Sequence, residues 1–295
     1  MVKVVASNQI AALVNDSATV YTCGFGLAGF PEEVAIKLKE SYLATGHPRN
    51  LHLYFAACIG NTKNRGIHHF APEGMVKRMV GGHFGVCGPD ISRLISDNKV
   101  EAYNFPQGVL AGMPRNIAAR RPGLITKVGL GTFVDPRLQG GKITTQTTED
   151  LVRLIELDGE EWLYYKAPKV DVALIRGTVA DEHGNLTLDR EGLILETISV
   201  AQAAKNCGGI VIAQVEQVTF SGPYAAAANK PVLYITERAV FQLTAQGLEL
   251  IEIAPGIDLE RDVLQHMEFT PIMNNVNTMD PAIFEETWGG LAAIL

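Results

Sequence analysis

The sequence predicts an α/β protein with an open, largely parallel β-sheet covered by helices, and three observations lead to this expectation. Short β-prone runs alternate with helical patterns over residues 18–220, and a glycine-rich turn (residues 24–29) joins the first run to the first helix. Hydrophobic residues make up 47% of the 295 positions, which is ample for a sizeable core. Such alternation is typical of parallel strands joined by helical crossovers.

The first half of the chain supplies most of the predicted sheet. Its N-terminal stretch, MVKVVASNQIAALVNDS, predicts the end of a strand and a short amphipathic helix, and it does not resemble a signal peptide. Residues 18–23 predict a strand, and PEEVAIKLKESYLATG predicts a helix with Pro31 in its first turn. The elements expected next are a buried strand NLHLYFAAC, a short helix–strand unit within GMVKRMVGGHFG, a helix DISRLISDN and a strand VEAYNFP.

A long segment without helical periodicity follows. Residues 120–147 are rich in Gly, Pro and Thr, and they predict a long loop with short strands, of the kind that tends to be functional in compact domains. Two strands, a helix and a further strand are expected after it, in WLYYKA, VDVALIRGTVADEHGNLTL, TISVAQAAKNCG and GGIVIAQVEQVTF.

The C-terminal residues do not continue the alternation of strands and helices. The stretch PVLYITERAVFQLTAQGLELIEIAPG predicts two strands joined at its AQG turn as an antiparallel hairpin. A helix DLERDVLQHM follows, with Asp258 as its N-cap.

Composition excludes several classes of function. Charged residues are 19% of the chain, the net charge is −7 and the Lys and Arg residues are scattered, so nucleic acid is not an expected partner. No apolar run reaches the roughly 20 residues that span a bilayer, and we place the protein in the cytoplasm, away from membranes. Asp181, His183, Gly184 and Asn185 indicate a turn and not a hydrolytic triad.

The cysteines and histidines do not form a metal-binding pattern. Four cysteines, Cys23, Cys58, Cys87 and Cys207, lie far apart, and we expect reduced thiols that pack as small buried hydrophobic residues. His68 and His69 are adjacent, so their side chains diverge in either a strand or a helix. We therefore expect no metal site.

The glycine-rich turn contains a G-x-G-x-x-G string, which raises the alternative of an NAD(P)-dependent oxidoreductase. That motif needs an acidic residue about 20 residues later to bind the ribose hydroxyls. The second strand here ends in YFAACIGN without a carboxylate, and Lys63 and Arg65 are at best partners for a 2′-phosphate. Phe30 and Pro31 directly follow the third glycine, so the helix begins later than in the dinucleotide-binding motif. This alternative is therefore the weakest of those considered.

Read from Gly24 to Pro31 as G-F-x-x-x-G-x-P, the same stretch resembles the N-terminal signature of the family I coenzyme A transferases, although Ser17 and Cys23 depart from the usual pattern. Further blocks resemble the acetate/propionate or short-chain acyl-CoA:carboxylate branch. They are NRGIHHFAPEGMVKRMVGGHFG, EAYNFPQGVL, KVGLGTFVDPRLQGGK, VALIRGTVADEHGNLTL and AAKNCGGIVIAQVEQV. Residues 1–218 thus resemble the N-terminal α/β domain of the family.

The tail resembles a different part of the same family. YITERAVFQL, GLELIEIAPGIDLERDVLQHMEFTP and MDPAIFEE resemble the extreme C-terminus, so we expect residues 219–295 to correspond to the end of the second domain, with the middle segment absent and the join near VEQVTFSG. That segment carries the catalytic glutamate of the family in a short E-x-G motif. Only Glu73 and Glu191 directly precede a glycine here, and neither has the E-[STN]-G pattern, so the nucleophile is not assigned.

The resemblance implies a mechanism. A glutamate attacks an acyl-CoA thioester and becomes a glutamyl-CoA thioester, which the acceptor carboxylate reopens. Gln107 matches the glutamine that contacts the oxyanion; the alternative is a solvent-exposed turn residue. The expected substrate-binding residues are Gly24, Phe25, Gly26, Leu27, Gly29, Gly108, Gly131, Thr132 and Phe133, with Gly129 beside them. The alternative is that these residues form structural turns and bind no ligand.

The function expected from the resemblance is transfer of CoA between a short-chain acyl-CoA and a carboxylate such as acetate or propionate. Coenzyme A thioester is then a substrate, no cofactor is permanently bound, and self-association as a homo-oligomer is the habit of the family. The alternative in a different class is a catalytically silent protein that binds CoA or acyl groups without the nucleophile. The sequence does not fix the preferred acyl length.

Overall fold

The chain forms two units in this computed structural model, Met1–Val218 and Thr219–Leu295. The structure describes residues 4–181, 183–219, 222–227 and 231–285. Phe220 and Ser221, within the join predicted at VEQVTFSG, lie outside the described residues.

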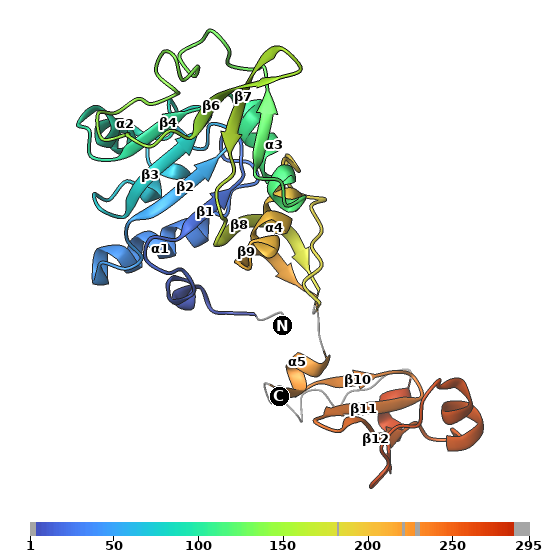
Figure 1. The fold of residues 1–295 in the computed structure, drawn as a ribbon. Coiled ribbons are helices and arrows are strands. Elements are labelled where there is room, and N and C mark those ends of the chain that lie inside the picture. The colour runs from blue at the N-terminus through green and yellow to red at the C-terminus, as the bar shows by residue number, and fades with distance from the viewer. Residues whose placement is uncertain (1–3, 182, 220–221, 228–230, 286–295) are drawn as a thin grey trace. The chain divides into compact units, whose positions relative to one another are not determined.

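The first unit is built on one fully parallel sheet, which confirms the predicted α/β fold (Figure 1). Its six strands run in the order β4-β3-β2-β1-β8-β9. Their bounds are β1 Thr19–Thr22, β2 Leu51–Phe55, β3 Val76–Gly81, β4 Glu101–Asn104, β8 Val172–Ala180 and β9 Ile210–Val218. Every neighbouring pair is parallel.

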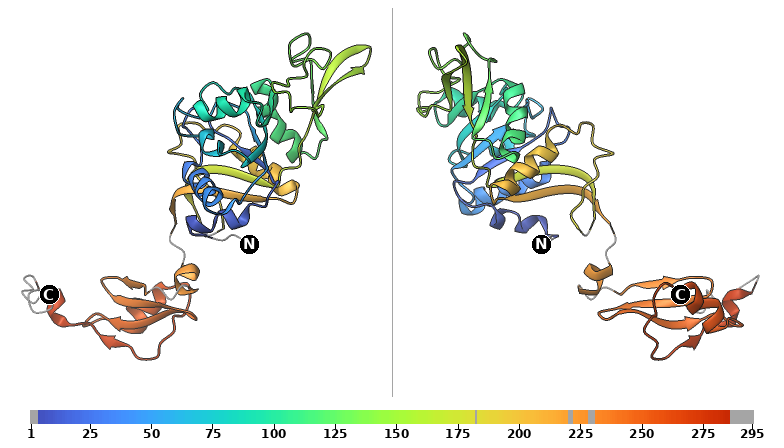
Figure 2. Two further views of the ribbon diagram at one scale, coloured as in Figure 1. Left: turned by 90° about the vertical axis from the view of Figure 1, so that its left-hand side faces the viewer. Right: turned by 45° about the vertical axis from the view of Figure 1, so that its right-hand side comes forward.

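Helices cover both faces of this sheet (Figure 2). α1 (Glu32–Thr45) and α2 (Pro89–Ser96) pack in one core, and α3 (Gln107–Ala118) and α4 (Thr197–Asn206) pack in the other. Successive residues of β2 alternate between the two cores: Leu53 and Phe55 face α1, whereas Tyr54 faces α3. This alternation follows from the period of two of a strand, and two covered faces explain why the strands are apolar throughout.

A three-stranded antiparallel sheet, in the order β5-β7-β6, interrupts the alternation after α3. Its strands are β5 Gly123–Thr126, β6 Val152–Leu157 and β7 Glu160–Lys166. The loop predicted over residues 120–147 contains one short strand, β5, where short strands were expected, and β6 was not predicted. The turn between β6 and β7 is Asp158-Gly159, a strong hairpin signal that the sequence analysis missed.

Two predictions for the first unit are wrong in detail. Residues 7–13 form two 3-10 turns, η1 (Ser7–Gln9) and η2 (Ala11–Leu13), in place of an amphipathic helix, and no strand precedes them in residues 4–6. A segment this short gains too few helical hydrogen bonds, so burial of Ile10 and Val14 in the core decides its conformation. The helical turn before β3 is η3 (Ile67–Phe70), which lies ahead of the stretch 74–85 where it was expected.

The second unit contains α5 (Gly222–Ala227) and a four-stranded sheet in the order β10-β11-β12-β13. The strands are β10 Leu233–Ile235, β11 Ala239–Thr244, β12 Gly247–Ile253 and β13 Asn277–Thr278. β11 and β12 form the predicted antiparallel hairpin, but a turn at Thr236, whose Oγ1 accepts the N–H groups of Arg238 and Ala239, splits the first predicted strand into two.

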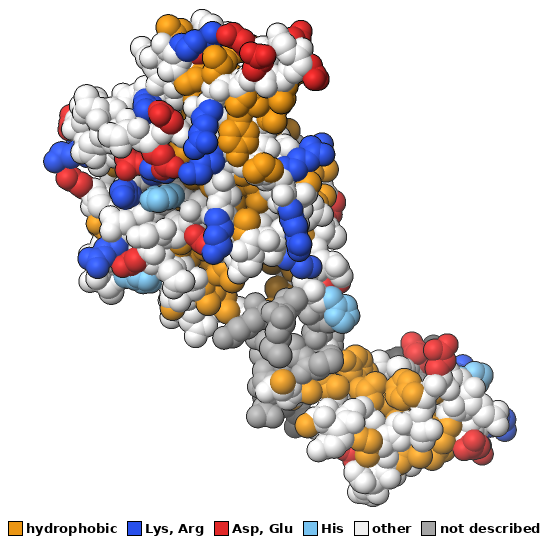
Figure 3. Space-filling model, viewed as in Figure 1, with side chains coloured by type: hydrophobic (Ala, Val, Ile, Leu, Met, Phe, Trp, Pro, Cys, Tyr) orange, Lys and Arg blue, Asp and Glu red, His pale blue; other side chains and the backbone are white. Residues whose placement is uncertain are grey.

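The helix predicted at DLERDVLQHM is a π-helical turn, η4 (Leu259–Val263), followed by a 3-10 turn, η5 (Leu264–His266). Asp258 does cap it, because its carboxylate accepts the N–H of Arg261 at 2.8 Å. Figure 3 shows apolar side chains exposed on this unit. Leu233, Ile235 and Phe269 are among its exposed apolar residues. Among the described helices of the whole chain, none is long and apolar enough to cross a membrane.

Candidate active site

The order of the parallel strands reverses at β1. Strands β2 to β4 extend the sheet to one side of β1, and β8 and β9 extend it to the other. In open α/β sheets, ligands bind at such a switch point, beside the carboxyl ends of the strands. The loop after β1 is the glycine-rich turn, and the loops after β2, β3 and β4 lie along the same edge.

The glycine-rich turn is fixed to the loop that follows β2. The N–H of Gly26 donates to the carbonyl of Cys58 at 2.8 Å, and the N–H of Gly60 donates to the carbonyl of Gly26 at 2.7 Å. Gly26 and Gly29 have φ of 59° and 68°, which favour glycine because a side chain would strain the backbone. Phe25 and Leu27 expose 53% and 40% of their surface, so apolar side chains face solvent beside the turn.

Gln107 begins α3 just after β4 and is exposed, as is Gly108. The side chain of Asn104 joins the ends of β3 and β4, because its amide nitrogen donates to the carbonyls of Gly81 at 3.1 Å and Gly82 at 2.8 Å. The side chain of Gln107 packs over Gly82. A Cβ atom added to Gly82 would lie 2.5 Å from Cγ of Gln107. A β-carbon on Gly108 would meet nothing within 4 Å, so the first turn of α3 is open to a ligand.

The second predicted loop is held by Asp135. Its carboxylate accepts the N–H of Gly131 at 2.9 Å, and the hydroxyl of Thr132 donates to the carbonyl of Gly129 at 2.7 Å. The Arg137 side chain, hydrogen-bonded to Asp135, holds the pKa of that carboxyl well below its usual range. Gly131, Thr132 and Phe133 are exposed.

This loop is also connected to the end of β4. The N–H of Gly141 donates to the carbonyl of Phe133 at 3.1 Å, and the carbonyl of Gly141 accepts the N–H of Asn104 at 2.8 Å. The loop is therefore tied to the strand that leads into Gln107.

A cleft of about 580 Å³ lies between the start of α3 and β5. Gly108 is the one residue of the predicted site that lines it. The other lining residues are Val109, Asn116, Arg121, Gly123, Leu124, Ile125, Thr126 and Val128. The lining is mostly apolar, with an amide and a guanidinium at its rim, which suits a small organic ligand.

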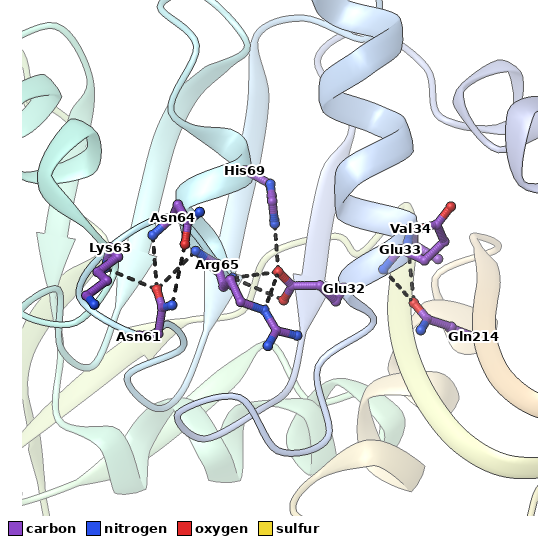
Figure 4. Close-up of polar contacts among 10 residues, drawn as sticks. Glu32, Glu33, Val34, Asn61, Lys63, Asn64, Arg65, His69 and Gln214 are labelled. Atoms are coloured by element: carbon purple, nitrogen blue, oxygen red, sulfur yellow. Dashed lines mark hydrogen bonds and ion pairs between the residues drawn. The ribbon is translucent and has the colours of Figure 1, made fainter.

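A network of polar contacts fixes the start of α1 and the loop before η3 (Figure 4). Glu32 accepts hydrogen bonds from Nε2 of His69 at 2.7 Å, Nε of Arg65 at 3.2 Å and the N–H of Gly66 at 3.1 Å. Gln214 of β9 accepts the N–H groups of Glu33 and Val34 and so caps the helix. Arg65, one of the two phosphate partners considered for a dinucleotide, is thus paired with Glu32.

Comparison with known proteins identifies the family. The sequence pattern of the coenzyme A transferases matches residues 4–236. The chain belongs to the coenzyme A transferase family. It is 50% identical over 216 residues to caffeate CoA-transferase of Acetobacterium woodii, covering 73% of this chain and 41% of that protein. It is 42% identical over 219 residues to acetate CoA-transferase YdiF of Escherichia coli K12, covering 74% and 41%.

The fold agrees with a solved transferase. The acyl-CoA transferase YdiF of E. coli O157:H7, in a thioester complex with CoA, superimposes with a TM-score of 0.70 at 25% identity over 97% of both chains. In sequence, this transferase chain spans about two fifths of the length of the curated relatives named above.

Both glutamates that directly precede a glycine in this chain form ion pairs. Glu73 is exposed and pairs with Nζ of Lys99 at 3.1 Å. Glu191 is 5% exposed at its side chain and pairs with Nε of Arg176 at 2.8 Å. Neither carboxylate belongs to an E-[STN]-G pattern, so the nucleophile stays unassigned.

The histidines and cysteines singled out in the sequence differ in how deeply they are buried. His68 and His69 are both buried, and His68 lies 3.3 Å from Asp90. Within the described residues, no three side chains of His, Cys, Asp or Glu gather as metal ligands. All four thiols are free, and Cys23 and Cys87 are buried as predicted, but Cys58 and Cys207 are only partly buried. Both follow the end of a secondary-structure element, where neighbouring loops leave them accessible.

The sequence analysis missed two groups. Sγ of Cys58 lies 2.9 Å from Nδ1 of His83, a pair that joins the loops after β2 and β3 and has no sequence signal. Glu196 precedes α4, and its Oε1 is buried without a hydrogen-bond partner among the described residues. Burial raises the pKa of Glu196. By contrast, Asp181 forms the predicted turn, accepting the N–H groups of His183 and Asn185, while Glu182 lies outside the described residues.

Proposed function

We propose that this chain belongs to an enzyme that moves CoA between a short-chain acyl-CoA and a short-chain carboxylate such as acetate or propionate. The observation that carries the proposal is the exposed Gln107, seated on Gly82 at the sheet edge that also bears the glycine-rich turn. Family membership and the names of the two relatives support transfer of CoA. Coenzyme A thioester is a substrate in this proposal, and no resident cofactor takes part.

Gln107 would stabilise the oxyanion that forms when a carboxylate attacks the thioester. Its neutral amide donates a hydrogen bond without introducing a charge that would pair with the nucleophile. Phe25 and Leu27, which are exposed beside the turn, would contact the apolar acyl group. The cleft lined by Gly108 would accept the adjoining part of the acyl-CoA.

The nucleophilic glutamate, in this proposal, belongs to a middle segment that this chain lacks. A match of 219 residues makes up 41% of the K12 YdiF sequence, whereas the structural match spans 97% of the YdiF chain from O157:H7. A chain of 295 residues can match YdiF from near its beginning to near its end only if an internal stretch of YdiF has no counterpart in this chain. This supports the proposal that residues 219–295 correspond to the end of the second domain.

A catalytically silent CoA-binding or acyl-binding protein is the second candidate. The ion pairs that engage Glu73 and Glu191 favour it, because they leave no assigned nucleophile. Self-association as a homo-oligomer, which is the habit of the family, is part of both proposals.

Incubation of the folded protein with acetyl-CoA and labelled propionate tests the first proposal. Intact mass is measured first, because a mass well above 31.9 kDa shows that the protein contains the middle segment with its glutamate. For such a protein we expect labelled propionyl-CoA. Gln107→Ala should then lower kcat about 100-fold or more, the usual effect of removing one oxyanion donor. Gln265→Ala is the matched control, because Gln265 is an exposed glutamine of the second unit. Binding of CoA without exchange would support the silent protein, and absence of both would overturn both proposals.

A further inference from the structure

A thiol and an imidazole lie together at the edge of the sheet that carries the glycine-rich turn. Sγ of Cys58 is 2.9 Å from Nδ1 of His83. Cys58 follows β2 and His83 follows β3, and these strands are parallel neighbours, so the loops after them lie side by side. Cys58 is partly buried and His83 is exposed, so a ligand has access to the pair.

The neighbourhood of His83 defines the direction of the hydrogen bond. The N–H of Gly85 donates to Nδ1 of His83 at 3.1 Å. A ring nitrogen that accepts a hydrogen bond carries a lone pair, so the ring proton of neutral His83 is on Nε2. The thiol of Cys58 then also donates to Nδ1, so the single lone pair of this nitrogen is shared between the thiol and the N–H of Gly85. A thiol that donates to an imidazole nitrogen has the arrangement of a nucleophile and its general base.

The sulfur of Cys58 is protonated at rest. Burial raises the pKa of the Cys58 thiol, and no cationic side chain is hydrogen-bonded to its sulfur among the described residues. Cys58 is therefore a thiol that becomes nucleophilic only as His83 removes its proton.

The pair is continuous with the proposed site. The carbonyl of Cys58 accepts the N–H of Gly26, in the glycine-rich turn. His83 directly follows Gly82, on which Gln107 is seated. Cys58 therefore contacts the turn through its main chain, and His83 follows the glycine that seats Gln107.

We propose that Cys58 accepts the acyl group of acyl-CoA, with His83 as its general base. Sγ attacks the thioester carbonyl while Nδ1 of His83 takes the thiol proton. The bond between the carbonyl carbon and the CoA sulfur then breaks, and the sulfur leaves as a thiol with that proton. One thioester replaces another, so the products are S-acyl-Cys58 and free CoA, and no oxidant or further reactant is needed.

The other cysteines lack this arrangement. Cys23 and Cys87 are fully buried, and burial raises the pKa of each thiol to about 12. Cys207 is partly buried like Cys58, but no histidine is hydrogen-bonded to its sulfur among the described residues. Cys207 is therefore the matched control for accessibility without a base.

The proposal rests on the proposed function only in taking acyl-CoA as the ligand, and mass spectrometry tests it directly. The full chain is incubated with acetyl-CoA, and peptides are mapped with and without neutral hydroxylamine, which cleaves thioesters. We expect one acetyl group on the Cys58 peptide, released by hydroxylamine, with free CoA formed in equal amount. Cys58→Ala should abolish this labelling, Cys207→Ala should leave it unchanged, and His83→Gln should slow it about 100-fold or more.

Different outcomes separate this inference from the proposed function. A glutamyl-CoA adduct adds the mass of CoA to the protein, whereas acylation of Cys58 adds only the acyl group. Labelling of Cys58 without transfer to propionate would sustain the inference and defeat the transferase. Folded wild-type protein that carries no acetyl group on Cys58, or carries as much on Cys207, would overturn the inference, and this result depends on no variant.

Discussion

The side chain of Gln107 rests on the α-carbon of Gly82, and the space between them admits no β-carbon. A Cβ atom at Gly82 would lie 2.5 Å from Gln107 Cγ and 2.0 Å from the carbonyl oxygen of Ala56. The second contact involves backbone, which cannot rotate away. Position 82, just after β3, therefore requires glycine for two reasons. The backbone of the loop after β2 lies too close for a side chain, and the side chain of Gln107 packs in the same space.

Gly82→Ala should lower both stability and activity. Forcing a methyl group into a filled space costs about 1–3 kcal/mol or more, and here the backbone at Ala56 or the side chain of Gln107 must move. We expect a lower urea midpoint. In the enzyme proposed above, we also expect a CoA-transfer rate that falls further than the loss of folded protein explains. A variant with wild-type stability would contradict the packing described above.

Gly108→Ala is the contrasting substitution at the same edge of the sheet. A Cβ atom there would meet nothing within 4 Å, and Gly108 lies in the first turn of α3. Alanine is favoured over glycine in a helix by up to about 1 kcal/mol. The urea midpoint should therefore rise or stay unchanged, and a marked fall would show that this turn is not open as described.

Asp135→Asn should destabilise the loop that carries Gly131, Thr132 and Phe133. Asp135 is 1% exposed and accepts hydrogen bonds from Nη2 of Arg137 at 2.7 Å and from Gly131. Loss of these charge-assisted bonds should cost about 1–3 kcal/mol. Asp150→Asn is the control, because the exposed pair of Asp150 with Lys142 contributes at most about 1 kcal/mol.

The same carboxyl predicts a dependence on pH. The folded pKa of Asp135 lies well below its ordinary value because of Arg137, so its stabilisation is present above about pH 4. It is lost as the pH falls from there through the folded pKa. Urea unfolding of Asp135→Asn should therefore show a weaker loss of stability in acid than the wild type shows, and parallel curves would refute this.

The sheet could be predicted from the sequence because its strands are covered on both faces. Buried runs such as residues 50–58 leave few alternatives to a parallel strand between helices. The outer elements were less predictable. The run from Tyr234 to Leu243 looks continuous, and only the side-chain hydrogen bonds of Thr236 divide it into β10 and β11.

Only those parts of the candidate site whose residues are close together in the sequence could be predicted. The glycine-rich turn and Gln107 were found because each is a short local pattern. Cys58 and His83 are 25 residues apart and meet only because β2 and β3 are neighbours, which no local pattern encodes. Glu196 was missed for the same reason, since its burial depends on packing beside β1.

Glu32→Ala should loosen the loop of residues 61–66. Its carboxylate accepts hydrogen bonds from His69, Arg65 and Gly66, and it is 15% exposed at the side chain. Removing it leaves buried donors unpaired, at about 1–3 kcal/mol. We expect faster hydrogen exchange in this loop and faster tryptic cleavage after Arg65. Glu33→Ala, which loses only a 3.7 Å surface pair with Lys37, should change neither.

Glu196 and Glu191 predict opposite responses to loss of a carboxylate, although they lie on the same segment. Glu191 is paired with Arg176 at 2.8 Å, so Glu191→Gln should destabilise the protein at neutral pH. Oε1 of Glu196 is buried without a partner among the described residues, and burial raises the pKa of this carboxyl. The unfolded chain therefore releases its proton more readily than the folded chain does.

Stability then falls as the pH rises from the ordinary glutamate value, about 4.3, to the raised pKa of Glu196, and the loss persists at higher pH. Glu196→Gln removes this titration. The variant should be more stable than the wild type at neutral pH, and the advantage should shrink towards pH 4. Urea unfolding across this range measures the difference. If Glu196→Gln destabilises the protein as Glu191→Gln does, the Glu196 carboxylate has a partner when ionised, and its burial does not destabilise the fold.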